Sequence, residues 1–286
     1  MQYTNALGLP DFVVQAIANM EHETVSGGVS TTELIAPVRQ RLLRWRHADE
    51  ITSDISDALH RARGTLMHYL LELTHTEGAI KEKLLTIPTE SGWILSGKPD
   101  LLLPEGDKWV LWDLKYVSYY AAADGVKPEY EAQINIYRHL CEQNGLPIKS
   151  ANILYWHPDW SRAAAHKDAS YPRCQIQVKP VHLWGPRKTE DYVSGRLAQH
   201  CLCYDLPDDK LPDCTPEERW QKDAEWAVMR PGRKSAVRCF SSPNEANDFR
   251  RNHKDSSVMW VDYREGVSAR CVGYCDPAAF CCYRRG

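Results

Sequence analysis

The chain has 286 residues, of which 43% are hydrophobic and 26% charged, and its formal net charge is −3. This composition supplies one sizeable hydrophobic core with room for a small appended unit. The charge balance excludes a basic field over the whole surface, so a nucleic-acid site would have to be local. No run approaches the roughly 18 uncharged apolar residues of a membrane span, and the N-terminus lacks the layout of a signal peptide. We therefore expect a cytoplasmic protein.

Helical patterns dominate the N-terminal part of the chain. Apolar residues follow helical spacing over residues 10–20 and 31–46, with Ser30, Thr31 or Thr32 available as N-cap before Glu33. A longer helix is predicted from about residue 54 to residue 76, because apolar residues recur there every three or four positions. One face of this long helix must be buried.

After this helix the sequence pattern changes to short apolar runs separated by Gly, Pro and charged residues. Residues 84–88, 92–104 and 108–117 predict three consecutive strands. A helix over 128–144, closed by Gly145, and a strand over 151–158 follow. This order predicts an α/β fold with a central mixed sheet flanked by helices, after an N-terminal helical region.

The C-terminal part is less regular. Residues 175–184 predict a strand, residues 189–206 a helix, and residues 207–220 a polar linker. A small unit of two strands, a helix and a last strand is predicted over 227–265. We expect three parts: residues 1–206, residues 207–265 with the linker and small αβ unit, and a cysteine-rich tail over 266–286.

Two carboxylates and a lysine stand inside the apolar strands. Asp100 follows Gly97-Lys98-Pro99, and Asp113-Leu114-Lys115 lies within WVLWDLKYV. Such charges are costly in a hydrophobic strand unless they are paired or bind metal. Because strand side chains alternate, Asp113 and Lys115 share one face, and the Leu114 carbonyl is left beside the site. These oxygens are the ligands that Mg²⁺ or Mn²⁺ prefers.

The motifs GKPDLLL, WVLWDLKYV and YEAQINIYRHL resemble the PD-(D/E)XK nuclease superfamily, in particular its RecB-like branch. The upstream segment RARGTLMHYLLE matches the histidine motif of that branch at His68, and Gln133 and Tyr137 match a Gln and a Tyr four residues apart on the helix after the catalytic strand. The resemblance covers roughly residues 25–157. It implies a restriction-endonuclease-like core.

The resemblance also implies a chemistry: hydrolysis of phosphodiester bonds by water activated at one or two divalent ions, leaving 5′-phosphates. His68, Asp100, Asp113 and the Leu114 carbonyl would hold Mg²⁺ or Mn²⁺, and Lys115 would serve the attacking water. Gln133 and Tyr137 would position the strand. The expected partner is DNA, single- or double-stranded and with a free end, with a recombination protein or a second copy of the chain as a further partner.

Ten cysteines are many for an intracellular chain, and eight of them lie between Cys201 and Cys282. Such a cluster indicates metal or iron–sulfur ligation more than disulfides. Some RecB-like relatives bind an iron–sulfur cluster through three C-terminal cysteines and one that precedes the nuclease core, and Cys271, Cys275 and Cys281 resemble the three. This chain departs from that pattern because it has no cysteine before Cys141.

The sequence leaves the identity of the fourth cysteine ligand open. Cys214, in the turn-rich segment LPDCTPEERW, is the preferred candidate, and Cys201, Cys203, Cys239 and Cys282 remain alternatives. A [4Fe-4S] cluster is the leading expectation, zinc is the alternative, and small buried hydrophobic side chains without metal are the third. Either metal centre would be structural, so its loss would cost folding before chemistry.

The sequence thus favours a divalent-metal-dependent DNA nuclease, an exonuclease or end-processing enzyme of phage or bacterial recombination or repair. The alternative is a nuclease-like module that holds DNA without cutting it and keeps a structural metal centre. Against that alternative, Asp100, Asp113 and Lys115 are all present. A zinc-bound adaptor with incidental carboxylates is a third reading.

Overall fold

The computed structural model describes residues 2–20, 25, 27–73 and 75–285, apart from the side chains of His60, Arg61, His68, Leu70, Glu72, Arg284 and Arg285. The chain divides into two compact units. One comprises Met1–Ala36 and Asp49–Leu206, and the other comprises Pro37–Ala48 and Pro207–Gly286. Within the described ranges, no helix is long and apolar enough to cross a membrane.

A five-stranded mixed sheet forms the centre of the first unit, which confirms the predicted fold class. Its order is β10-β9-β8-β7-β4. The strands are β4 (Ile80–Lys81), β7 (Leu101–Glu105), β8 (Lys108–Tyr116), β9 (Ile148–Trp156) and β10 (Ile176–Pro180). β8 pairs antiparallel with β7 and parallel with β9, so the crossover from β8 to β9 carries a helix.

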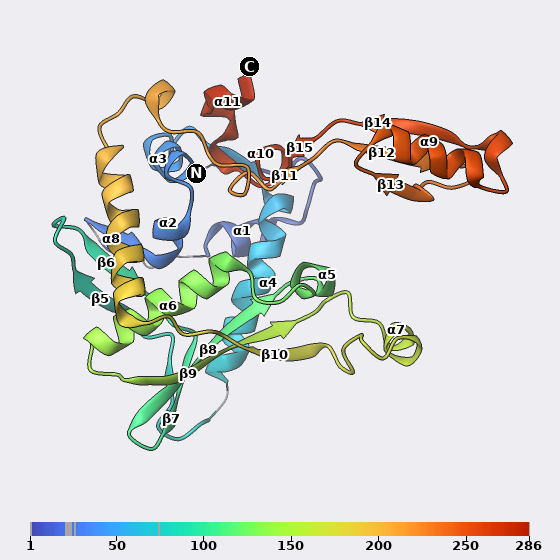
Figure 1. Ribbon diagram of the computed structural model, residues 1–286. Coiled ribbons are helices and arrows are strands. Elements are labelled where there is room, and N and C mark those ends of the chain that lie inside the picture. The colour runs from blue at the N-terminus through green and yellow to red at the C-terminus, as the bar shows by residue number, and fades with distance from the viewer. Residues whose placement is uncertain (1, 21–24, 26, 74, 286) are drawn as a thin grey trace. The chain divides into compact units, whose positions relative to one another are not determined.

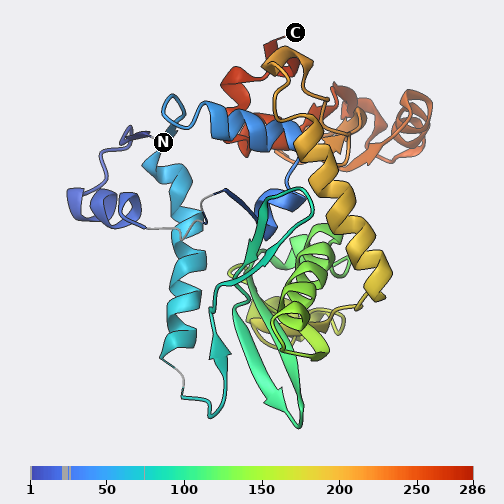
Figure 2. The same ribbon diagram turned by 90° about the vertical axis from the view of Figure 1, so that its left-hand side faces the viewer.

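Helices cover this sheet, as Figure 2 shows with the pale-blue α4 on one side of the strands and the green α6 on the other. They are α4 (Ile55–Glu72), α6 (Pro128–Gln143) and α8 (Pro186–Leu202). The core between sheet, α6 and α8 is built from fully buried residues such as Leu111, Ile134 and Ile153. Burial of each such side chain stabilises the fold by roughly 2 kcal/mol, which explains the apolar runs of the sequence.

The predicted strand over 92–104 is wrong as a single element. The structure breaks it into β6 (Ile94–Gly97) and β7, which belong to different sheets. β6 lies between β2 (Gly28–Ser30) and β5 (Leu85–Pro88) in a second, three-stranded sheet. The break falls at Lys98-Pro99-Asp100, because Pro99 has no N–H to donate to a ladder.

The apolar pattern over 31–46 likewise divides into α2 (Thr31–Ile35) and α3 (Val38–Arg46). Ala36 is extended, with φ −60° and ψ 149°, as a residue before proline tends to be. Ser30 caps α2 in a capping box with Glu33, as the sequence predicts.

Gly97 must be glycine because of a close approach at the end of β6. A Cβ there would lie 2.6 Å from Leu140 Cδ1, 2.6 Å from Thr31 Oγ1 and 2.9 Å from Tyr137 Cε1. These distances are well inside van der Waals contact. The glycine therefore lets α6 and α2 close over β6 beside the predicted catalytic residues.

Six short elements that the structure describes in the first unit are not predicted by the sequence patterns. They are β2 and β4, together with β1 (Gln2–Thr4), β3 (Thr52–Asp54), α5 (Tyr119–Ala122) and α7 (Arg162–Lys167). β1 and β3 pair in parallel, and α1 (Asp11–Ala18) packs against α4. Pairing between residues about 50 positions apart leaves no local signature in a sequence.

The second unit contains the predicted small αβ element. β12 (Glu225–Met229) lies between β13 (Arg238–Phe240) and β14 (Trp260–Arg264), and α9 (Pro243–Asn252) covers one face around buried Val228, Ala246 and Met259. Figure 1 shows this αβ element in orange beside the red C-terminal segment. That segment holds α10 (Ala269–Gly273), a 3₁₀ turn over Asp276–Phe280 and α11 (Cys282–Arg285).

The short elements β11 (Gln221–Lys222) and β15 (Val267–Ser268) pair antiparallel at the base of the αβ element. Helix α3 belongs to this unit although it lies within residues 1–206, which the sequence predicts as one part. Arg39 of α3 is 4% exposed and donates to the carbonyl oxygens of Leu211 and Pro212. A buried guanidinium that donates to backbone carbonyls fixes α3 to this segment.

Candidate active site and cysteine cavity

Strands β7 and β8 bring together the three residues predicted to form the active site. The Lys115 Nζ atom lies 2.7 Å from Asp113 Oδ2, and these side chains are 17% and 2% exposed. Asp100 directly precedes Leu101, the first residue of β7 that pairs with β8, and the Asp100 side chain is buried as well. The predicted alternation along β8 is therefore observed, with Asp113 and Lys115 on one face.

Leu114 contributes its backbone to this site. Its N–H donates to Asp100 Oδ2 at 2.6 Å, while its side chain is buried. The N–H and the C=O of one strand residue point to the same side. The Leu114 carbonyl is thus directed to the Asp100 side of β8, where the sequence predicts a metal ligand.

Helix α6 extends the site by a line of hydrogen bonds. Lys115 Nζ donates to Gln133 Oε1 at 2.9 Å, and Gln133 Nε2 donates to Tyr137 Oη at 3.0 Å. Gln133 of the i, i+4 pair predicted on this helix therefore contacts β8 directly, and Tyr137 contacts it through Gln133. Asp113, Lys115, Gln133 and Tyr137 form one connected polar network.

A cleft of about 500 Å³ opens over this network, within the size range of ligand sites. Its lining includes the charged residues Glu82, Lys98, Asp100, Asp113 and Lys115. Three carboxylates and two ammonium groups leave an excess of negative charge. A divalent cation would reverse the sign and make the cleft attractive to phosphate. The oxygen donors Asp100, Asp113 and the Leu114 carbonyl fit Mg²⁺ or Mn²⁺ in chemistry.

His68 lies on α4, which packs against β8. Its side chain is outside the part of the chain that the structure describes. Its role as a metal ligand therefore stays a prediction.

The electrostatics of the cleft follow from burial and close carboxylates. Burial opposes the charge of Lys115, but Asp113 and Asp100 outweigh that effect and raise the pKa of its ammonium group. Burial, followed by the charges of Asp113 and Asp100, raises the pKa of the Tyr137 hydroxyl well above its usual range. Tyr137 is therefore a neutral hydrogen-bonding group in this network.

The sequence patterns did not single out Glu82, which also lines the cleft. Its Oε2 atom lies 3.2 Å from Lys98 Nζ, and its backbone N–H donates to the Asp100 carbonyl at 3.1 Å. The backbone φ of Glu82 is 45°, in the left-handed region that residues other than glycine rarely adopt. Such strain often marks functional sites, but it leaves no trace in a sequence because it is a property of the folded backbone.

We expect Glu82→Gly to be more stable than Glu82→Ala by about 1 kcal/mol in free energy of unfolding, because only glycine adopts this φ without steric cost. Both variants lose the ion pair with Lys98, so their difference isolates the backbone strain. Urea unfolding followed by circular dichroism measures it. Equal stability of the two variants would show that residue 82 carries no strain.

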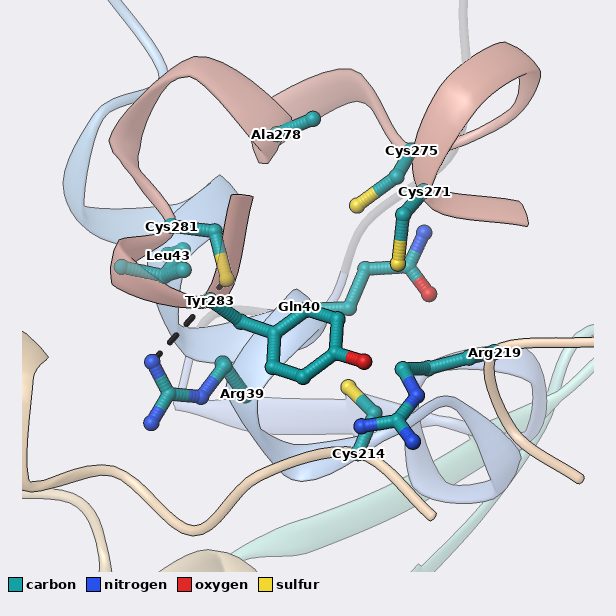
Figure 3. A pocket seen from close by; sticks show the side chains of 10 residues that line it. All are labelled: Arg39, Gln40, Leu43, Cys214, Arg219, Cys271, Cys275, Ala278, Cys281 and Tyr283. Atoms are coloured by element: carbon teal, nitrogen blue, oxygen red, sulfur yellow. Dashed lines mark hydrogen bonds between the residues drawn. The ribbon is translucent and has the colours of Figure 1, made fainter. Parts of the chain in front are cut away.

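A second cavity, in the other compact unit, is lined by the four predicted cysteines. Cys214, Cys271, Cys275 and Cys281 surround it, and Figure 3 shows their sulfur atoms directed toward the space between them. Burial, and then the neighbouring thiols Cys271, Cys214 and Cys281, raise the pKa of Cys275 to about 12. Burial is also the main cause that raises the pKa of Cys214 to about 11. The four side chains therefore lie within electrostatic reach of one another.

Two guanidinium groups, Arg39 and Arg219, line the same cavity. Arg39 Nη1 lies 2.9 Å from Cys282 Sγ and 3.9 Å from Cys281 Sγ. The Arg39 guanidinium therefore contacts sulfur atoms of the C-terminal segment directly. Cys282 and Cys239 are exposed and are not among the cavity-lining residues, so within this unit the structure favours Cys214 as the fourth cysteine.

Four thiols around one cavity are the donor set of a Cys₄ zinc site or of a [4Fe-4S] cluster. Among the side chains that the structure describes, however, no group of three or more His, Cys, Asp or Glu is already arranged to hold a metal ion. Thiols must lose their protons before they ligate a metal. The donor set fits in composition, and the cluster and its ligands remain a proposal.

Comparisons with solved structures return remote likenesses. A crystal structure described as SSO0001 has a TM-score of 0.49 and 14% identity, over 69% of this chain and 87% of that chain. An alkaline exonuclease (LHK-Exo) from Laribacter hongkongensis has a TM-score of 0.36 and 14% identity, over 63% of this chain and 90% of that chain. The complex of LHK-Exo with dAMP has a TM-score of 0.39 and 16% identity, over 63% of this chain and 90% of that chain.

No curated protein matches the chain. The model of one protein family does match it, over residues 30–281, and that family is described as the PD-(D/E)XK nuclease superfamily. The match covers the central sheet, the cleft with Asp100, Asp113 and Lys115, and the four cysteines that line the second cavity. The chain therefore belongs to the PD-(D/E)XK nuclease superfamily.

Proposed function

We propose that the protein is a divalent-metal-dependent deoxyribonuclease that hydrolyses phosphodiester bonds from a free DNA end. The observation that carries the proposal is the connected network of Asp113, Lys115, Gln133 and Tyr137 beside buried Asp100 in one cleft. Membership of the PD-(D/E)XK nuclease superfamily supports the reaction class.

Asp100, Asp113, the Leu114 carbonyl and His68 would hold Mg²⁺ or Mn²⁺. When bound, the ion supplies Lewis acidity that activates water and offsets charge on the phosphate. The bond from phosphorus to the 3′ oxygen breaks, and a bond from phosphorus to the water oxygen forms. The water proton leaves to solvent and the 3′ oxygen takes up a proton, so the products carry a 5′-phosphate and a 3′-hydroxyl.

The side chains of this chain would orient that reaction. Lys115 lies where its ammonium group can donate to the attacking water or to a phosphate oxygen, while Gln133 fixes its direction. Gln133 is in turn oriented by Tyr137, so this pair positions Lys115 in addition to contacting the DNA strand.

For the cysteine cavity we propose a structural metal centre bound by Cys214, Cys271, Cys275 and Cys281, with a [4Fe-4S] cluster as the first choice and zinc as the alternative. It would stabilise the second compact unit and take no part in hydrolysis. We also propose that the enzyme serves recombination or repair of phage or bacterial DNA, with a recombination protein or a second copy as partner.

The reaction is tested on end-labelled linear DNA and covalently closed circular DNA in Mg²⁺, Mn²⁺ or EDTA, with protein purified without oxygen. We expect degradation of the linear DNA only with a divalent ion, and no cutting of the circle. Cutting of the circle would replace the exonuclease with an endonuclease. Binding of DNA without cutting in every condition would favour the inert DNA-binding module.

A further inference from the structure

An aromatic platform follows the catalytic strand. β8 ends at Tyr116, one residue after Lys115, and the chain continues through Val117 and Ser118 into the single turn α5. Tyr120 on this turn is 76% exposed, among the most exposed aromatic side chains of the described chain. Figure 1 shows α5 at the end of β8.

The backbone under Tyr120 is held at several points. The Asp159 carboxylate accepts from Ser118 Oγ at 2.6 Å and from the Tyr119 N–H at 2.8 Å. His157 Nδ1 lies 3.0 Å from the Val117 carbonyl oxygen, and the Val117 N–H donates to the Trp156 carbonyl at 3.2 Å. The turn is therefore fixed to the segment that follows β9.

The ring under Tyr120 is fixed as well. Tyr119 contacts Tyr171 with ring centroids 4.6 Å apart and His157 with centroids 5.7 Å apart. Tyr171 and His157 are both buried. Tyr120 itself contacts Tyr119 with ring centroids 5.5 Å apart and an interplanar angle of 64°, and most of the Tyr120 side chain stays exposed to solvent. Because the residues that support Tyr120 are already immobilised, little conformational entropy is lost when a planar group stacks on its ring.

The short stretch of chain between Lys115 and Tyr120 limits how far the Tyr120 ring can lie from the proposed reaction site. Tyr120 lies five positions after Lys115, so their Cα atoms are no more than about 18 Å apart. With a rise of about 3.4 Å per stacked nucleotide, this reach corresponds to about five nucleotides. Tyr120 is therefore near enough to contact a base a few positions from the bond being cut.

We propose that Tyr120 stacks on an unpaired base of the DNA strand, so that the enzyme engages single-stranded or frayed ends better than fully paired ends. The inference rests on the proposed function, because DNA is the ligand assumed. An unpaired base exposes the π-face that an aromatic ring requires, whereas a base inside a duplex is covered by its neighbours. The stack would accept any base.

The test compares Tyr120→Leu, which removes the ring, with Tyr120→Phe, which keeps it. Phe12→Leu is the matched control, because Phe12 on α1 is 75% exposed. Binding is measured in EDTA by fluorescence anisotropy, with a single-stranded oligonucleotide and with a duplex closed by hairpins. We expect Tyr120→Leu to raise the Kd for the single strand about tenfold, and to change the Kd for the closed duplex less than about twofold.

We expect Tyr120→Phe and Phe12→Leu to bind like wild type, and wild type and Tyr120→Phe to quench 2-aminopurine in the oligonucleotide more than Tyr120→Leu does. Equal binding of all variants to the single strand overturns the inference, as does a loss in Tyr120→Phe equal to that in Tyr120→Leu. Tyr120-dependent binding without any cleavage would keep the stacking site and remove the proposed nuclease reaction. Cleavage by a protein whose DNA binding is unaffected by Tyr120→Leu would keep the proposed nuclease reaction and remove the stacking site.

Discussion

Asp113→Asn is expected to lower the rate of DNA cleavage by about 10³-fold or more, while DNA binding in EDTA changes little. The substitution keeps the shape of the side chain but removes the charge that would hold the divalent ion. Preorganised charges of this kind commonly account for factors of 10² to 10³ in rate, and loss of the ion adds to that. Cleavage of end-labelled linear DNA at saturating Mg²⁺ measures the effect.

Asp107→Asn is the matched control, because Asp107 is exposed in the turn between β7 and β8 and does not line the cleft. It should cleave at the wild-type rate. A wild-type rate in Asp113→Asn would remove Asp113 from the reaction. Circular dichroism of both variants must first show the same folded state.

Lys115→Met separates the catalytic effect from stability. It leaves the 2%-exposed Asp113 carboxylate without its ammonium partner, so we expect a loss of about 3 kcal/mol in free energy of unfolding in EDTA. Combining Asp113→Asn with Lys115→Met removes both charges and should recover most of that stability without recovering cleavage. A stable but inactive double variant would show that the pair serves chemistry and not folding.

The second large effect is expected at the cysteine cavity. Cys275→Ser should remove the bound metal and lower the thermal stability of the second compact unit, because a structural metal centre contributes its binding free energy to folding. Wild-type protein purified without oxygen should contain about four iron atoms and acid-labile sulfide if the centre is a [4Fe-4S] cluster, or one zinc atom if it is a Cys₄ zinc site. Metal analysis and thermal unfolding measure both effects.

Cys239→Ser is the control, because Cys239 is exposed on β13 in the same unit and does not line the cavity. It should keep the metal and the melting temperature of wild type. Wild-type protein without iron, sulfide or zinc would leave the four cysteines as half-buried side chains that bind no metal. Metal retained in Cys275→Ser would place the centre on other ligands.

Periodicity determined most of the helices and strands of this protein, because apolar spacing reports which face of an element is buried. It failed at proline. The segment 92–104 looked like one strand, but Pro99 cannot donate to a ladder, and its two halves pair in different sheets. Pairing of β1 with β3 was also invisible, since partners distant in sequence leave no local pattern.

The sequence by itself determined the motif residues of the cleft, because a charged residue inside an apolar strand is costly without a role and stands out for that reason. Strand alternation then placed Asp113 and Lys115 on one face, and helical spacing joined Gln133 to Tyr137. These are local rules with fixed periods of two and about four residues, so they need no tertiary structure.

Only the tertiary structure decided what depends on contacts between distant segments. The donation from Lys115 to Gln133, the strained Glu82 at the cleft, and the gathering of Cys214 with the three C-terminal cysteines around one cavity are of this kind. So is the difference between pinned Tyr119 and exposed Tyr120, two adjacent and identical residues. Their surroundings differ because burial and hydrogen bonding are set by what the rest of the chain packs against them, which no local pattern encodes.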